Sequence, residues 1–222
     1  VPTSLMERFD RNIVYGPDSS LSTYCERRIS EMKSFTRILM LLLLILGLLI
    51  LSGMAMAAEI NLIKNTSMEL ADSSNPNMPS GWKTWKSTTA TIDFGWSKDV
   101  AYDGKCSLVL GEVSGAGSAC WQTGVINVVK GKKYKASIYI KAQGIAPGEE
   151  VTFSLYWWAF APRAIIHRTS EKYELTGDTD WMLVTVEGVA ADDIDQVAVH
   201  FFRTAPAQGR IWIDKASLVQ LD

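Results

Sequence analysis

The stretch VTFSLYWWAF, residues 151–160, decides the fold. Every second side chain in it, beginning with the first valine, is apolar, whereas the side chains between them combine hydroxyl groups with aromatic rings. An alternation with a period of two residues is typical of a β-strand that buries one face. We therefore expect Trp157 to point into a core, and Tyr156 and Trp158 to point outward.

The same alternation recurs along the chain from residue 58 onward. Short stretches rich in Gly, Pro, Asn and Asp separate the alternating segments, as turns would, and no apolar period of 3.6 residues is sustained. Many short strands at this spacing predict an all-β sandwich in one domain. The expected strands cover residues 90–94, 107–113, 119–128, 133–142, 151–160, 165–175, 181–187, 194–204 and 210–219.

The outward faces of these strands carry further aromatic and polar side chains. Tyr139 and His200 are both outward in their strands, and we expect Tyr139, Tyr156 and Trp158 to lie on one sheet. A face that mixes aromatic rings with hydrogen-bonding groups differs both from a solvated surface and from a second core. We interpret it as a contact surface.

An apolar run, ILMLLLLILGLLIL at residues 38–51, precedes the alternating segments. Lys33 and Arg37 stand before it and small residues follow it, which is the pattern of a secretory signal peptide, here over residues 32–57. An uncleaved membrane anchor is the alternative, although the run falls short of the ~20 apolar residues that span a bilayer. We expect a secreted or extracellular domain; a periplasmic or cell-surface location also fits this signal.

The domain boundaries follow from the position of that signal. Met32 is its expected first residue, so we predict that residues 1–31 are translated upstream sequence, or else a polar tail. The mature domain is then expected to cover residues 58–222.

The charge balance and the cysteines narrow the function classes. Lys and Arg total 22 against 24 Asp and Glu, a net charge of -2, which lacks the basic footprint of a nucleic-acid binder. The three cysteines do not have metal-ligand spacing. If GEVSGAGS (111–118) forms a hairpin turn, Cys106 and Cys120 lie several residues apart along the ladder, which argues against a disulfide.

Six segments, in order, resemble segments of carbohydrate-binding modules of the family 4, 9 and 22 type. The resemblance covers residues 60–220 and departs from the family pattern at Met68, where Phe is usual. It implies a jelly-roll β-sandwich of the kind attached to secreted polysaccharide-degrading enzymes. The six segments are INLIKNTSMEL (60–70), GWKTW (81–85), DVAYDGKCSLVL (99–110), WQTGVINVVKGKKYKASIYIKA (121–142), TDWMLVTVEGV (179–189) and GRIWIDKASLVQL (209–221).

The resemblance also implies a glycan site on the outward face. Aromatic rings offer flat apolar faces to sugar rings, and amides or imidazoles bond to the hydroxyls. Trp121 and Gln122 stand where the family often places a binding aromatic and amide, and Trp181 is expected in the core. Loop residues Trp82, Trp85 and Trp96 are candidates for the rim. The expected ligand-binding set is Trp158, Tyr156, Tyr139, Trp121, Gln122 and His200.

A structural calcium is implied by the same resemblance, tying the first strand to the last. The matching positions are Glu69, the main-chain carbonyl of Lys105, and Asp214. Calcium takes six to eight oxygen ligands, and carboxylates and carbonyls from separate segments suit it. The alternative is that both acids are hydrogen-bonded near the chain ends without a metal.

Catalysis is not expected. Glycoside hydrolysis needs two carboxylates across a cleft, and the outward faces show no convincing acid pair. The sequence carries no nucleophile elbow, phosphate loop or zinc motif. We expect a monomeric, non-catalytic module that binds a polysaccharide or oligosaccharide. The alternatives are a surface or structural β-sandwich that makes protein contacts, and an accessory fragment of a glycoside hydrolase.

Overall fold

The computed structural model describes residues 28, 36–40, 42–43, 59–159 and 164–221. The chain divides into two units, residues 1–58 and 59–222. The described residues of the first unit are helical, and most of the expected signal peptide lies outside the described residues, as does nearly all of the segment before it. Within the described part of the chain, no helix combines the length and the apolar character that crossing a membrane requires.

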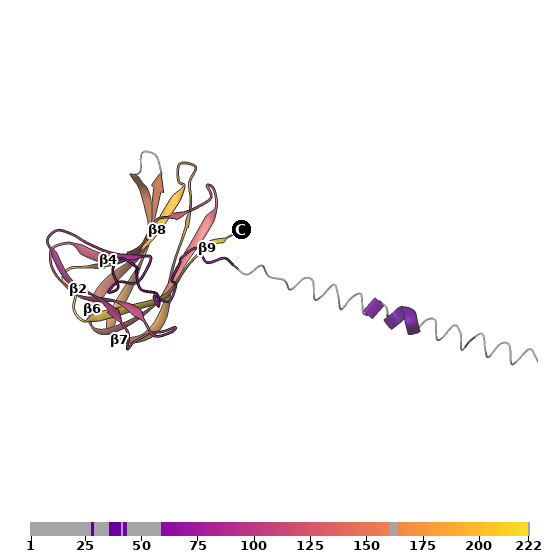
Figure 1. The fold of residues 1–222 in the computed structure, drawn as a ribbon, viewed down its shortest axis with the longest axis horizontal. Coiled ribbons are helices and arrows are strands. Elements are labelled where there is room, and N and C mark those ends of the chain that lie inside the picture. Colours follow the sequence, from indigo (N-terminus) through magenta and orange to yellow (C-terminus); the bar gives the residue numbers. More distant parts are fainter. Residues whose placement is uncertain (1–27, 29–35, 41, 44–58, 160–163, 222) are drawn as a thin grey trace, which may run out of the picture. The chain divides into compact units, whose positions relative to one another are not determined.

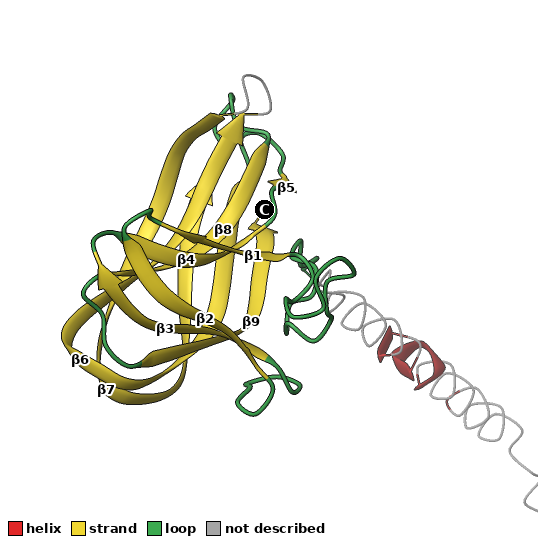
Figure 2. Cartoon of the chain, turned by 60° about the vertical axis from the view of Figure 1, so that its left-hand side comes forward, coloured by secondary structure: helices red, strands yellow, loops and turns green. Residues whose placement is uncertain are grey.

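The second unit is built from strands in its described residues, 59–159 and 164–221, where no helix occurs (Figure 2). The strands are β1 (Trp82–Lys86), β2 (Ala90–Ser97), β3 (Ser107–Gly115), β4 (Ser118–Thr123), β5 (Ile126–Asn127), β6 (Lys133–Ala159), β7 (Ala164–Val189), β8 (Gln196–Thr204) and β9 (Arg210–Leu221).

The two longest strands, β6 and β7, pair with each other along most of their length. The expected turn QGIAPGEE (143–150) does not separate two strands, because residues of this segment pair with residues 174–177 of β7. Register shifts and the positive φ angles of Gly144 and Gly148 let the paired strands bend there. Each expected pair of strands, 133–142 with 151–160 and 165–175 with 181–187, is therefore one long strand.

Because β6 and β7 bend together, each contributes to two layers (Figure 1). The first arm of β6 pairs with β9, and β3 and β2 follow beyond β9; we call this layer A. The second arm of β6 pairs with β8, and β4 and β1 follow beyond β8; we call this layer B. The hydrogen-bonded strand order is β1-β4-β8-β6-β9-β3-β2, with β7 on β6 and β5 on β8.

The core lies between the two layers. The apolar phase of each arm of β6 points into it, and Ile138 from layer A and Phe153 and Trp157 from layer B belong to one buried cluster. Burying such side chains fully contributes about 1.5–3 kcal/mol each. The predicted all-β sandwich and the inward phase of Trp157 are confirmed.

Strands β3 and β4 follow each other in the chain without pairing. The hairpin expected at GEVSGAGS is therefore wrong: β3 pairs with β2 and β9 in layer A, whereas β4 pairs with β1 and β8 in layer B. Cys106 and Cys120 are both buried and free.

Candidate functional site

The pairing of layer B places aromatic and polar side chains in rows across its outer face. In one row Trp85 lies opposite Cys120, which lies opposite Phe202. The row continues from Phe202 to Thr152 of β6 and to Lys172 of β7. Directly paired residues in a sheet point to the same side, so these five strands present one continuous surface.

Four rings on this surface touch one another. Trp85 meets Phe202 edge to face, with centroids 6.0 Å apart and planes at 76°. Phe202 lies 5.6 Å from Tyr156, and Tyr156 is stacked on His200 at 4.0 Å and 19°. Trp85 remains 47% exposed, so the cluster of Trp85, Phe202, Tyr156 and His200 offers apolar ring surface to a ligand.

Beside this cluster lies a groove of about 500 Å³, within the range of small-molecule sites. Its hydrogen-bonding groups are hydroxyls and two cationic side chains, and none of its lining residues carries a carboxylate. The arrangement can stack a flat apolar ring face and bond several hydroxyls at once. The groove is lined by Trp85, Ser118, Thr152, Ser154, Tyr156, Arg168, Ser170, Lys172, Phe202 and Thr204.

His200 supports the cluster from below. Burial lowers the pKa of its imidazole to about 4, so the ring is neutral at pH 7. Its Nδ1 lies 3.8 Å from the Sγ of Cys120, and burial raises the pKa of that thiol to about 12. The thiol therefore stays protonated, and this pair cannot act as a nucleophile and base.

The structure brings together three of the predicted ligand-binding residues. Tyr156 and His200 are in the cluster, and Gln122 lies directly opposite His200 in the sheet. Trp158 is outward as predicted, but it is half-buried and does not line the groove. Its Nε1 is a buried nitrogen without a hydrogen-bond partner among the described residues.

One predicted ligand-binding residue, Tyr139, lies in the other layer. Tyr139 is outward and shares a hydrogen-bonded sheet with Tyr156, as expected, but the bend in β6 places it on the other arm of that strand, away from the groove. In layer A its ring stacks on Tyr102 at 3.8 Å. Trp181, expected in the core, is half-buried and meets Tyr102 edge to face at 5.8 Å.

Trp121 is a core residue, so its placement on the binding face is wrong. It is 1% exposed, and its Nε1 donates to the carbonyl of Val109 at 2.8 Å. In β4 the outward phase passes through Cys120 and Gln122, which leaves Trp121 in the inward phase. Trp82, a candidate for the rim, is buried as well. The other rim candidate, Trp96, is half-buried and donates from Nε1 to the Met68 carbonyl.

Phe202, Arg168 and Lys172 were missed as site residues. The outward phase of Phe202 was visible in the sequence, but its proximity to Trp85 depends on β1 pairing with β4 and β4 with β8. Strand periodicity does not reveal the register between segments more than 100 residues apart in the chain. Arg168 and Lys172 face the groove because β7 continues as the edge strand of layer B.

Glu69 and Asp214, the expected calcium ligands, hold one turn from two sides. Glu69 accepts hydrogen bonds from the backbone N–H groups of Lys105 and Cys106 at 2.8 and 2.7 Å. Asp214 accepts from those of Tyr102 and Asp103 at 2.7 and 2.8 Å, and burial raises the pKa of its carboxyl.

These contacts are those of the alternative in which both acids are hydrogen-bonded. Among the described residues, no three His, Cys, Asp or Glu side chains gather around one point where a metal would fit. Both oxygens of Asp214 already accept backbone N–H bonds, whereas both bonds to Glu69 go to its Oε1. Calcium there stays a prediction.

Solved structures resemble this chain in fold. The enzymatically active domain of tailspike protein 4 from bacteriophage CBA120 matches with a TM-score of 0.56 and 16% identity, over 73% of this chain and 22% of that chain. An arabinose-bound GH51 α-L-arabinofuranosidase matches with a TM-score of 0.52 and 18% identity, over 72% and 26% of the two chains. This chain thus spans about a quarter or less of the length of either protein.

Carbohydrate-binding modules are also among the matched structures, as the sequence resemblance predicted. One described as "CBM4 structure and function" has a TM-score of 0.49 and 19% identity, over 72% of this chain and 99% of that chain. No protein-family model and no curated protein matches the sequence. At these identities the likeness concerns the fold alone, and it holds for the matched parts of the two structures with TM-scores above 0.5.

Proposed function

We propose that residues 59–222 form a secreted, monomeric and non-catalytic carbohydrate-binding module with a jelly-roll topology. The module holds a polysaccharide or oligosaccharide chain along the groove of layer B. The observation that carries this proposal is the row of touching rings, Trp85, Phe202 and Tyr156, beside a groove lined with hydroxyl groups. The apolar run at 38–51 supports delivery out of the cell.

The groove suits a sugar chain because it combines two kinds of contact. Pyranose rings have apolar C–H faces that pack on aromatic rings, and their hydroxyl groups need donors and acceptors at the sides. Thr152, Ser154 and Ser170 supply hydroxyl groups, and the side chains of Arg168 and Lys172 supply donors. The likeness to carbohydrate-binding modules supports the same reading.

The lining of the groove supports binding without hydrolysis. Glycosidases use two carboxyl groups on opposite sides of the scissile bond, and the residues that line this groove carry none. The side chains of Arg168 and Lys172 carry hydrogen-bond donors for sugar hydroxyls.

The test is affinity electrophoresis of the 59–222 unit through gels that contain different neutral polysaccharides. Trp85→Ala and Tyr156→Ala should each weaken retardation by about 1–3 kcal/mol, or roughly five- to 150-fold in Kd, by analogy with buried aromatic anchors in interfaces. Trp181→Ala removes an equally large ring from layer A and should leave retardation unchanged.

Melting curves keep this test independent of folding. Trp85 is half-exposed, so its removal should leave the melting temperature close to that of the wild type. The proposal is wrong if no polysaccharide retards the wild type, or if both groove variants migrate like the wild type. Stable dimers in size-exclusion chromatography that Trp85→Ala dissolves would instead show that the aromatic cluster serves protein contacts.

A further inference from the structure

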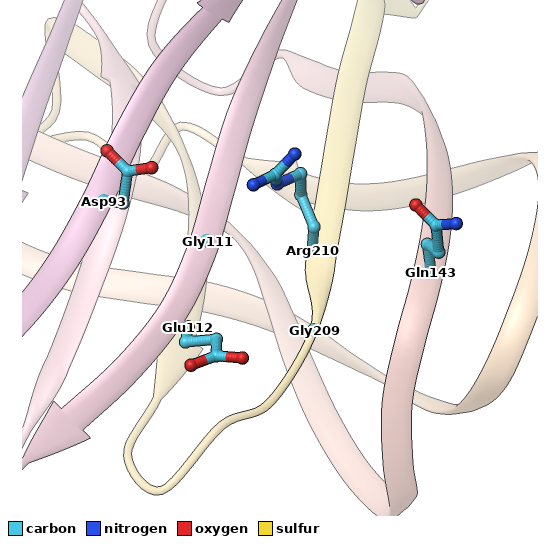
Figure 3. Close-up of a pocket in the computed structure, with 6 residues that line it drawn as sticks. All are labelled: Asp93, Gly111, Glu112, Gln143, Gly209 and Arg210. Atoms are coloured by element: carbon cyan, nitrogen blue, oxygen red, sulfur yellow. The ribbon is translucent and has the colours of Figure 1, made fainter.

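A second hollow lies on the outer face of layer A. It has a volume of about 470 Å³ and is lined by residues from β2, β3 and β6 and from the start of β9 (Figure 3). Its lining residues are Asp93, Gly111, Glu112, Gln143, Gly209 and Arg210. The groove and this hollow share no lining residue, so the hollow is a separate site.

Two glycines make the hollow possible. A methyl group on Gly111 would lie 3.0 Å from the Asp93 carbonyl oxygen and 3.1 Å from the Asp93 Cβ. Gly209 has a φ of 75°, and a side chain there would overlap the carbonyl oxygens of Gln143 and Gly144. Any other residue would therefore strain or fill this part of the sheet.

A buried arginine fixes the floor from behind. Arg203 is 0% exposed, and its Nη1 donates to the carbonyls of Gly111 and Gly209 at 2.6 and 2.9 Å. Its guanidinium also forms a bidentate pair with Glu149, at 2.6 and 3.0 Å. Bidentate pairs of this kind fix geometry as well as charge. The two glycines are thus held in place by an interaction that the solvent does not reach.

The rim of the hollow carries polar side chains with unused hydrogen-bonding capacity. Asp93, Glu112, Gln143 and Arg210 are exposed, and the structure gives none of their side chains a hydrogen bond or an ion pair with a described residue. In Figure 3 both carboxylates lie on one side of Arg210 and the Gln143 amide lies on the other. The Cζ of Arg210 lies 6.0 Å from the centroid of the Trp212 ring, and this cation–π contact orients the guanidinium.

A register shift explains why the two acids reach the same hollow. Ile92 pairs with Val113 and Phe94 pairs with Leu110, so Asp93 alone faces two residues of β3. Such a β-bulge re-aims side chains and is frequent next to binding sites. It lets Glu112 join Asp93 at the rim although Gly111 and Glu112 are neighbours in one strand.

We propose that this hollow is a second carbohydrate-binding site, which takes one or two neutral sugar residues. Planar carboxylates accept hydrogen bonds from sugar hydroxyls, while the guanidinium and the amide donate to them, so each rim group can span a neighbouring pair of hydroxyls. Two acids against one arginine disfavour an acidic sugar. The inference rests on the proposed function, and it makes the module bivalent, with one site on each layer.

The test uses the 59–222 unit with its groove disabled by Trp85→Ala and Tyr156→Ala. Isothermal titration with neutral gluco-, xylo-, manno- and galacto-oligosaccharides of three to six residues should give two sites per wild-type chain and one per disabled chain. Adding Asp93→Ala and Arg210→Ala to the disabled chain should weaken the remaining binding at least tenfold. A matched pair of exposed residues outside both sites, Lys130→Ala and Asp192→Ala, should leave it unchanged.

The outcomes separate the two proposals. One site in the wild type and none in the groove-disabled chain would overturn the hollow and leave the groove intact. Unchanged binding after Trp85→Ala and Tyr156→Ala, but loss after Asp93→Ala and Arg210→Ala, would overturn the groove and retain the hollow. If the groove-disabled chain still binds sugar and the rim substitutions do not weaken that binding, the sugar binds elsewhere and the hollow is overturned. A wild type that binds no sugar overturns both.

A second measurement tests bivalency directly. A module with two sites cross-links soluble polysaccharide, so the wild type should increase the turbidity of a solution of any polysaccharide that it binds. Each single-site variant should still bind that polysaccharide and should lose the turbidity. Full turbidity with the rim variant would contradict the second site.

Discussion

The groove of layer B and the hollow of layer A have opposite constructions on the same sandwich. In the groove, large rings from β1, β6 and β8 stand above the sheet, and Trp85 and Tyr156 form part of its wall. In the hollow, the surface is depressed because Gly111 and Gly209 have no side chains. A β-sandwich core constrains the inward phase of each strand, and it leaves the outward phase free to take either form.

The groove and the hollow also differ in the buried groups that hold them in place. The groove rests on a buried neutral imidazole, His200, which stacks under Tyr156. The hollow rests on a buried ion pair, Arg203 with Glu149, which binds the main chain of its floor. The groove therefore depends on a buried group that is neutral, and the hollow on a buried pair of opposite charges. A substitution under one site leaves the surface residues of the other unchanged.

Breaking the ion pair should have the largest effect on the fold. Arg203→Met leaves the Glu149 carboxylate buried and without its cationic partner, and it frees four main-chain carbonyls. We therefore expect a loss of about 3–5 kcal/mol in the free energy of unfolding. Denaturant titration measures it. Lys133→Met breaks an exposed pair with Glu187 and should cost at most about 1 kcal/mol.

A double variant sharpens this result. Arg203→Met combined with Glu149→Leu removes both buried charges, so part of the lost stability should return. If the double variant is as unstable as the sum of the two single variants, the pair is not coupled, and the hollow's floor does not depend on it.

Lowering the pH should reduce the stability of the fold through His200, which lies under the groove. Its folded-state pKa of about 4 lies below the ordinary value of 6.5, so the folded state binds fewer protons and stability is lost as the pH falls through this window. At about 1.36 kcal/mol per unit, stability should fall by roughly 2 kcal/mol between pH 7 and pH 5. His200→Gln should flatten that slope in denaturant titrations at each pH. Equal slopes in both proteins would show that His200 is not the titrating group.

Removing the carboxylate of Glu69 or Asp214 should have the smallest effect on stability, and neither residue belongs to the groove or the hollow. Glu69→Ala leaves two backbone N–H groups without their acceptor, and we expect a loss of about 1–2 kcal/mol. This loss should appear in chelator, because it does not depend on a metal. If calcium also binds, millimolar calcium raises the melting temperature of the wild type and leaves that of Glu69→Ala unchanged; identical wild-type curves in chelator and calcium contradict the metal.

The sequence predicted the sandwich because alternation reports directly on burial. For residues 151–159 the predicted inward and outward phases are both correct, including the inward Trp157. The site was predicted in part. The outward phase of Tyr156, His200 and Tyr139 was right, but the separation of Tyr139 from the other two was not foreseen, because a bend in a continuous strand looks like a turn in the sequence. The hollow was not predicted, since its floor depends on contacts of Arg203 with chain segments about 90 residues away.

The place of β9 in the sheet has a consequence for synthesis of the protein. β9 lies between β3 and the first arm of β6, and the segment near the start of the domain joins it as well, through Asn61 and Leu62. The β6–β7 hairpin joins residues near each other in the chain and can pair early. Layer A cannot close until residues 210–221 leave the ribosome. Until then β3 and the first arm of β6 each present an unpaired strand edge, which favours aggregation.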